Sequence, residues 1–80
     1  MTNTATITDF IGTKIKHGSP GYMNEETVAT VEFLSDRVEI EFESGCFTQM
    51  KPEEFEFMMQ YQELFYNEMT HNGLSQIVFA

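Results

Sequence analysis

The residues with the clearest chemical potential in this chain are carboxylates that recur at every second position. Three glutamates alternate with apolar residues over positions 38–43, and a fourth precedes them across a short turn: Glu39, Glu41, Glu43 and Glu32. A period of two places such residues on one side of a β-strand. The pattern is not the calcium loop of an EF-hand, although weak binding of a divalent cation stays open. A surface of one charge sign suits a cationic partner, or it serves only to keep a small domain soluble.

The spacing of these acids resembles that of phosphates. Alternate residues on a strand repeat every ~6.6 to 6.8 Å, so two adjacent acidic strands place a charge about every 3.4 Å, as phosphates do along one DNA strand. A face of this kind fits a protein groove that holds nucleic acid. The predicted partner-binding residues are Glu32, Asp36, Glu39, Glu41 and Glu43, together with Glu25 and Glu26 on the loop that enters the hairpin. The acids of the predicted helix, including Glu68, carry less weight.

Side chains that could catalyse a reaction are few and scattered. His17 and His71 are separated by most of the chain, and no serine stands in a Gly-x-Ser-x-Gly elbow. The glycines match neither a phosphate loop nor a dinucleotide fingerprint. Cys46 is the single cysteine, which excludes an internal disulfide, and no Cys/His cluster has zinc-site spacing. We therefore predict no enzyme, no catalytic residue, no cofactor and no dedicated metal site.

Composition limits both the size of the fold and its partners. Eighty residues form one domain, 1–80, with a small core rich in phenylalanine and methionine. Four basic against 13 acidic residues give a net charge of −9, which repels nucleic acid and anionic membranes. The expected partner is the basic surface of a nucleic-acid-handling protein. The amino terminus lacks the features of a signal peptide, and no apolar run approaches ~20 residues, so a cytoplasmic location is expected.

Residues 29–43 predict the hairpin that positions the acids. Apolar residues alternate on both arms. A two-residue turn at Ser35 and Asp36 pairs apolar residues with apolar residues and acidic residues with acidic residues across the hairpin. In that register Glu32 faces Glu39 and Phe33 faces Val38. The pairing is expected to continue back to Ala29 opposite Phe42.

Further elements are placed around this hairpin. A first strand starts near Ile11, with a short helix over 8–12 as an alternative, and a Gly/Pro loop at 18–21 leads to the second strand near Glu26. Residues 46–50 return as a strand with Phe47 facing Phe42. A long helix runs from Pro52 to Thr70 or His71, and residues 74–80 form a last short strand.

The expected fold class is therefore α+β, a small antiparallel sheet packed with one long helix near the C-terminus. The sheet consists of a three-stranded meander plus terminal strands, either open or closed as an SH3-like barrel. The helix carries more large apolar residues than one face can bury. Phe57, Tyr61 and Tyr66 are therefore a secondary candidate for partner binding, either in an adaptor module or at a homodimer contact.

The order of motifs resembles that of SH3-like and Tudor-like small barrels. The motifs are Gly12–His17, the glycine loop, Glu26–Glu32, and Arg37–Gly45. Similar layouts occur in RNA-polymerase-binding Tudor-like domains and in the carboxy-terminal domain of UvrD-type helicases, which implies a binding module of nucleic-acid machinery over residues 11–50. In size and charge the chain also resembles small acidic phage-encoded inhibitors of the anti-CRISPR and anti-restriction type. That resemblance implies a DNA mimic acting on a CRISPR effector in the host cytoplasm.

Overall fold

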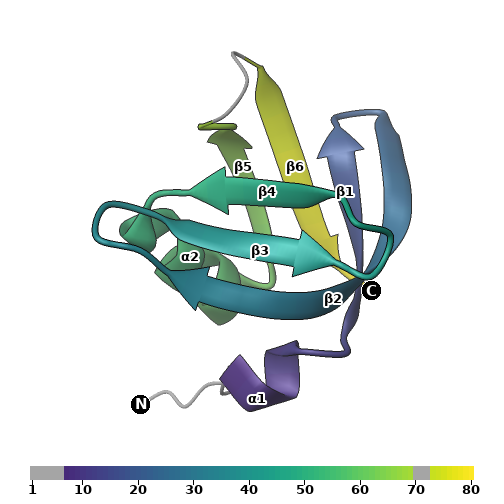
Figure 1. The fold of residues 1–80 in the computed structure, drawn as a ribbon. Coiled ribbons are helices and arrows are strands. Elements are labelled where there is room, and N and C mark those ends of the chain that lie inside the picture. Colours follow the sequence, from purple (N-terminus) through teal and green to yellow (C-terminus); the bar gives the residue numbers. More distant parts are fainter. Residues whose placement is uncertain (1–6, 70–72) are drawn as a thin grey trace.

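Over residues 7–69 and 73–80, the fold is a six-stranded antiparallel sheet with two short helices (Figure 1). The computed structural model describes residues 7–69 and 73–80. Neighbouring strands follow the order β4-β3-β2-β1-β6-β5. In chain order the elements are α1 (Ile7–Phe10), β1 (Lys14–Ser19), β2 (Tyr22–Phe33), β3 (Val38–Phe42), β4 (Phe47–Met50), α2 (Pro52–Tyr61), β5 (Glu63–Asn67) and β6 (Leu74–Phe79).

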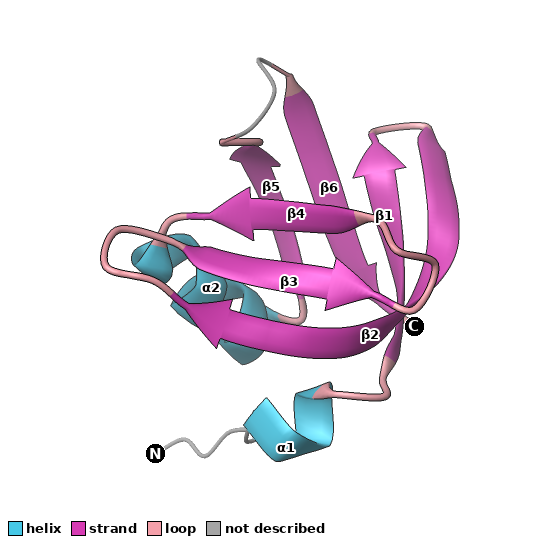
Figure 2. Ribbon diagram, viewed as in Figure 1, coloured by secondary structure: helices cyan, strands magenta, loops and turns pink. Residues whose placement is uncertain are grey.

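Strand β2 is long enough to belong to both halves of the sheet. Residues 22–27 pair with β1, and residues 28–33 pair with β3. The register shifts between Val28 and Thr30, and such a bulge bends a strand and increases its twist. As a result, β3 and β4 cross in front of β5 and β6 (Figure 2).

The bend brings the two edge strands together at one end. The Gln49 backbone N–H on β4 donates to Glu68 Oε1, directly after β5, at 2.8 Å. The Met69 N–H donates to the Gln49 carbonyl at 3.4 Å. These contacts partly cover edges that would otherwise expose unpaired backbone groups.

One hydrophobic cluster fills the interior between the two halves of the sheet and the helices. Phe10 of α1 stacks on Phe79 with ring centroids 5.4 Å apart and meets the edge of Phe55 of α2 at 6.1 Å. The remaining buried apolar residues come from every strand and from α2: Ile15, Val28, Val38, Ile40, Phe42, Met50, Met58, Leu64, Tyr66 and Ile77 accompany Phe10 and Phe55.

The predicted hairpin is confirmed near its turn and wrong at its base. Glu32 pairs with Glu39 and Phe33 with Val38, and the Leu34 N–H donates to the Arg37 carbonyl at 2.8 Å to close the turn. Beyond the bulge, however, Phe42 pairs with Val28 instead of Ala29. The bulge adds one residue to β2, so Val28 takes the buried position.

The predicted returning strand is confirmed as β4, and the predicted last strand as β6. Phe47, however, stands opposite Glu41, so it lies on the outer face instead of beside Phe42. The second strand also begins earlier than predicted, at Tyr22 instead of near Glu26. At the N-terminal side, the short-helix alternative describes α1 better than a strand starting at Ile11, because β1 begins only at Lys14.

The prediction of one long C-terminal helix is wrong, and with it the predicted fold class. Helix α2 ends at Tyr61 because Gln62 adopts the left-handed conformation, with φ 64°, and its N–H donates to the Met58 carbonyl at 2.7 Å. The chain then continues as β5, where Leu64 and Tyr66 are buried. Strand residues therefore dominate the fold, and the predicted helix end at Thr70 or His71 lies outside the described residues.

Candidate functional site

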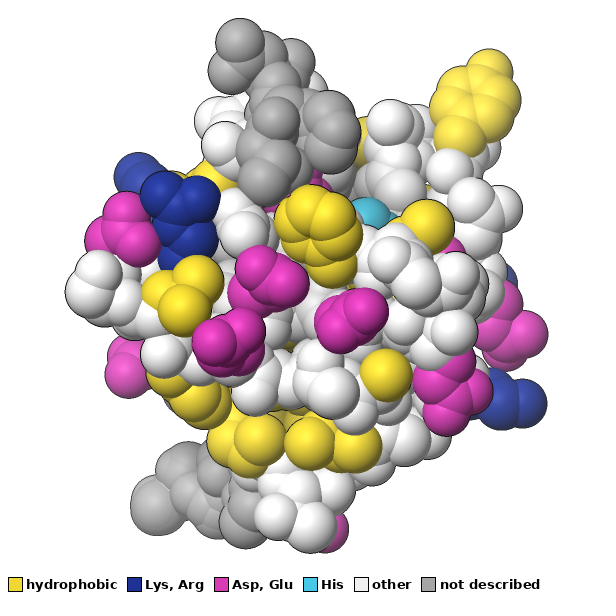
Figure 3. All heavy atoms as spheres, in the orientation of Figure 1, with side chains coloured by type: hydrophobic (Ala, Val, Ile, Leu, Met, Phe, Trp, Pro, Cys, Tyr) yellow, Lys and Arg dark blue, Asp and Glu magenta, His cyan; other side chains and the backbone are white. Residues whose placement is uncertain are grey.

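Three of the predicted acids form one row on the outer face of the sheet. Glu32 and Glu39 are direct cross-strand partners of β2 and β3, and Glu41 follows two residues along β3. Their side chains point away from the core, because Ile40, which lies between Glu39 and Glu41, is fully buried on the other side of the strand. Figure 3 shows Asp and Glu side chains gathered over these strands, beside hydrophobic side chains. We call Glu32, Glu39 and Glu41 the acidic row.

Hydrogen bonds hold parts of the acidic row in place. Gln49 Nε2 donates to Glu39 Oε1 at 2.8 Å, and Arg37 Nη1 donates to Gln49 Oε1 at 2.8 Å. The Thr30 hydroxyl donates to Glu41 Oε1 at 3.4 Å. Glu39 is therefore ordered before any partner arrives, which lowers the entropic cost of binding.

Asp36 contributes little charge to this face. Arg37 donates to both of its carboxylate oxygens, from Nε at 3.0 Å and from Nη2 at 3.1 Å. The hydrogen bonds from Arg37 hold the pKa of Asp36 below its usual value. The pair is exposed and screened, so its main effect is to neutralise the hairpin turn.

The predicted phosphate-like spacing is not reproduced on this face. Because Glu32 stands level with Glu39, the two charges lie side by side and do not alternate along the strands. Thr30 stands opposite Glu41, and on β4 the neighbours in the row are Gln49 and Phe47. The acids of β3 therefore repeat at the two-residue spacing of a single strand, ~6.8 Å.

The other predicted acids lie elsewhere. Glu25 stands opposite Lys16 on β1, and Glu26 stands opposite the buried Ile15, so these neighbours point to opposite sides of β2. Both are strand residues and not part of a loop. Glu43 is exposed in the turn that follows β3.

The predicted aromatic helix face is only partly present. Phe57 and Tyr61 lie on α2 with ring centroids 4.5 Å apart, and they are 48% and 57% exposed. Tyr66 is not on a helix; it is buried in β5, so the prediction that these three residues share a helix face is wrong. Phe65, which is exposed on β5, and Phe57 both line a shallow cavity beside the helix.

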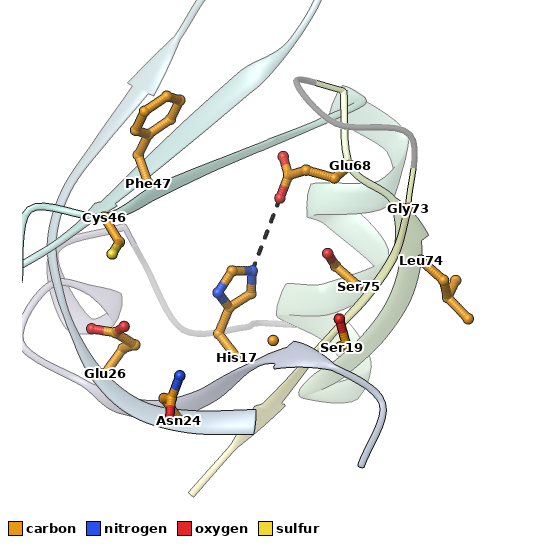
Figure 4. Close-up of a pocket in the computed structure, with 11 residues that line it drawn as sticks. His17, Ser19, Asn24, Glu26, Cys46, Phe47, Glu68, Gly73, Leu74 and Ser75 are labelled. Atoms are coloured by element: carbon orange, nitrogen blue, oxygen red, sulfur yellow. Dashed lines mark ion pairs between the residues drawn. The ribbon is translucent and has the colours of Figure 1, made fainter. Parts of the chain in front are cut away.

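A pocket with both polar and apolar walls opens near the start of β4 (Figure 4). It has a volume of about 380 Å³ and lies where the end of β1 and the segment after β5 meet the starts of β2, β4 and β6. Phe47 lines it and also stands opposite Glu41, so this one residue borders both the pocket and the acidic row. The full set of described lining residues is His17, Gly18, Ser19, Asn24, Glu26, Cys46, Phe47, Glu68, Gly73, Leu74 and Ser75.

A chain of hydrogen bonds connects two lining residues of this pocket, His17 and Glu68, through residues buried behind them. His17 Nε2 lies 3.1 Å from the Tyr66 hydroxyl, and that hydroxyl bonds to the hydroxyl of Thr48. Thr48 in turn donates to Glu68 Oε2, while Glu68 Oε1 accepts the Gln49 N–H. Glu68 is 7% exposed. A fully bonded polar network of this kind fixes the geometry of the residues that belong to it.

The direction of each bond in this chain follows from the number of hydrogens. A Glu68 carboxylate can only accept hydrogen bonds, so Thr48 donates its single hydroxyl hydrogen to Glu68. Tyr66 must then donate to Thr48, and His17 must donate its Nε2 hydrogen to Tyr66. Burial raises the pKa of Tyr66, which keeps the phenol protonated. The neutral imidazole is therefore the Nε2–H tautomer, and its Nδ1 is an acceptor that no described residue uses.

Sequence reasoning missed this pocket because it placed Glu68 on a helix and treated His17 as an isolated histidine. One signal was available. In the sequence, Leu64, Tyr66 and Glu68 stand two positions apart, which is the period of a strand. In the structure all three side chains are buried, as expected when one side of such a segment faces the core.

Compared with protein families, curated proteins and solved structures, the chain has no match. Within residues 7–69 and 73–80, no helix is long and apolar enough to cross a membrane. The same residues contain no group of three or more His, Cys, Asp or Glu side chains arranged to hold a metal ion. The candidate function therefore rests on the geometry of the acidic row and the adjoining pocket.

Proposed function

We propose that the protein is a non-enzymatic inhibitor or regulator that binds a basic surface of a nucleic-acid-handling protein. One observation carries the proposal: the face of β2 and β3 presents Glu32, Glu39 and Glu41 together, while the nearby Arg37 is already paired with Asp36. Like charges directly opposite each other on a sheet cost stability. A cationic partner relieves that repulsion, and this relief adds to the favourable free energy of binding.

The partner is identified by its chemistry. A net charge of −9 attracts cationic protein surfaces, and nucleic-acid-binding grooves are a common surface of that kind. Competition with DNA for such a groove remains the mechanism we propose, with a CRISPR effector in the cytoplasm of a phage-infected host as its most specific form. Because the acids of β3 do not follow phosphate spacing, general charge complementarity supports this mechanism, not point-by-point mimicry.

Charge reversal on the acidic row tests the proposal. The variant Glu39→Lys with Glu41→Lys should lose tenfold or more in affinity for the partner, about 1.4 kcal/mol, because attraction becomes repulsion. Its thermal stability should stay constant or rise, since Glu32 then faces a lysine. The measurement is capture of proteins from lysate by the tagged chain at low and high salt, followed by titration of the captured partner.

A control carries the same charge change on other elements. Glu56→Lys with Glu63→Lys alters exposed residues of α2 and β5 and should retain binding. The expected partner is a nucleic-acid enzyme that high salt releases. Undiminished binding by the Glu39/Glu41 variant would rule out the acidic row as the binding surface.

The exposed rings of α2 support a second candidate function, an adaptor or dimerisation module of the SH3-like or Tudor-like kind. Phe57 and Tyr61 contact each other as exposed rings tilted by 42°, and Phe65 lies exposed on the neighbouring β5. Exposed aromatic groups of this type occur at protein interfaces. Substituting Phe57 and Tyr61 by serine would abolish binding in this case, and the charge reversals would have no effect.

A further inference from the structure

The pocket beside the acidic row contains a buried negative charge without a permanent counter-ion. Glu68 is 7% exposed, and its oxygens accept hydrogen bonds from neutral donors, the Thr48 hydroxyl and the Gln49 N–H. Among the described residues, the only cationic group within ion-pair distance is His17, with Nε2 4.0 Å from Glu68 Oε2. Buried charges in proteins are usually paired, so this site has an unused preference for a cation.

His17 does not supply that cation near neutral pH. Burial lowers the pKa of His17, and the opposing influence of Glu68 and Glu26 is smaller. With Nε2–H donated to Tyr66, the second ring nitrogen keeps its lone pair. Figure 4 shows that this nitrogen faces the side of the pocket where Asn24 and Cys46 lie. The imidazole therefore offers the pocket a hydrogen-bond acceptor.

The other polar walls also favour a group that only donates hydrogen bonds. Glu26 lines the pocket with a second carboxylate, which is held by the Ser44 hydroxyl at 2.8 Å. The described lining residues include neither lysine nor arginine. Phe47, 45% exposed, and Leu74 add apolar surface at the rim, where the methylene groups of a long side chain can pack. Ammonium and guanidinium groups donate hydrogen bonds and accept none, so they complement a wall that offers acceptors.

We propose that this pocket receives the cationic end of a lysine or arginine side chain from the basic partner. The inference rests on the proposed function and deepens it, because it identifies one anchoring contact beside the acidic row. Phe47 connects the two parts, since it stands opposite Glu41 on the outer face and lines the pocket. The volume of about 380 Å³ is at the lower end of the range of ligand pockets and accommodates such a side chain.

Small-molecule probes test the pocket without the partner. The full chain, labelled with ¹⁵N, is titrated with N-acetyl-arginine amide, N-acetyl-lysine amide and the neutral analogue N-acetyl-citrulline amide. The cationic probes should produce saturable NMR shifts at His17, Glu26 and Cys46, and the citrulline probe should produce none in the same concentration range. Equal shifts with citrulline, or no saturable shift with either cation, would overturn the proposal.

Matched variants locate the binding. Glu26→Gln removes a pocket carboxylate and should weaken binding of the cationic probes several-fold. Glu56→Gln removes the same charge from the exposed side of α2 and should leave that binding unchanged. If the Glu68→Gln variant folds, it should no longer bind the cationic probes. If it does not fold, the Glu26 variant and the comparison with citrulline still test the proposal. Equal affinities for the Glu26 and Glu56 variants would overturn the proposal.

The protonation of His17 gives a readout that a merely structural pocket would not show. The groups that face His17 are Tyr66 and Glu68 from the β5 side, Asn24 and Glu26 from β2, and Cys46 just before β4. A bound cation should lower the His17 pKa further, and probe affinity should fall as pH decreases through that pKa. An unchanged His17 pKa at probe saturation would contradict contact with the ring. If the chain binds the probes but no basic partner, the proposed function of the acidic row is refuted and the pocket proposal stands. If it binds the partner but not the probes, the pocket proposal is refuted and the proposed function stands.

Discussion

At the scale of single residues, the organising feature is the bonded chain from His17 to Glu68. It joins the first strand of the sheet to the segment after β5, and Tyr66 is its central member. Removing one member of a buried network leaves its neighbours unsatisfied, which costs more than the lost bond itself. The residues of the pocket wall therefore also stabilise the fold.

The neutral state of His17 makes stability depend on pH. Burial lowers its folded pKa below the unfolded value of 6.5, so the unfolded chain binds more protons between the two values. This stabilising contribution is complete above about pH 6.5 and is lost as pH falls below that value through the folded pKa. Urea unfolding between pH 7.5 and 5 should show a steeper loss for the wild type than for His17→Gln. Equal slopes would contradict a buried, neutral imidazole.

At the residue scale, the sequence predicted which acids are exposed better than it predicted their partners. The alternation of residues 38–42 fixed the orientation of Glu39 and Glu41, because period-2 patterning decides which side of a strand faces water. It could not reveal that Arg37 would neutralise Asp36 or that Glu26 would line a pocket. Those contacts depend on the bulge in β2 and on strands distant in sequence.

At the scale of elements, the hairpin was predictable and the end of α2 was not. In the hairpin, turn length and hydrophobic pattern agree on one register. In residues 52–71, large apolar residues occur so densely that helical and strand periodicities both fit. The decisive feature is the left-handed Gln62, where the sequence offers no glycine to mark a helix end.

That left-handed residue leads to a test at the same scale. Gln62→Gly should stabilise the protein by about 0.5–1 kcal/mol, because glycine adopts a positive φ without the steric cost of a Cβ. Gln60→Gly, on the exposed side of the same helix, should instead destabilise by about 1 kcal/mol. Urea denaturation midpoints of the two variants measure both effects. A loss of stability in the Gln62 variant would show that its side chain makes an essential contact.

At the scale of the whole molecule, the net charge of −9 places like charges against one another across a small fold. The clearest instance is Glu32 directly opposite Glu39. Self-repulsion of this kind lowers stability, and salt screens it over a distance of about 10 Å at 0.1 M. The acidic surface and the stability of the protein are thus linked.

Sodium chloride should therefore stabilise the isolated protein. Raising its concentration from about 20 to 300 mM should increase the free energy of unfolding by on the order of 1 kcal/mol. Glu32→Gln removes one charge from the acidic row, so it should be more stable at low salt and gain less from added salt. Thermal melts across the salt series measure both quantities. A fall in stability with salt would mean that attractive ion pairs dominate the surface.

The order of strands has a further consequence for how the molecule is made. Strand β6 comes after the other five strands in the chain, yet it lies between β1 and β5 in the sheet. Until a ribosome has synthesised and released residues 74–79, β1 and β5 have no neighbour on that side, and Ile77 is missing from the core. A nascent chain stalled before β6 would expose two open edges, which are templates for aggregation. Folding of this domain is therefore expected to wait until residues 74–79 have left the ribosome.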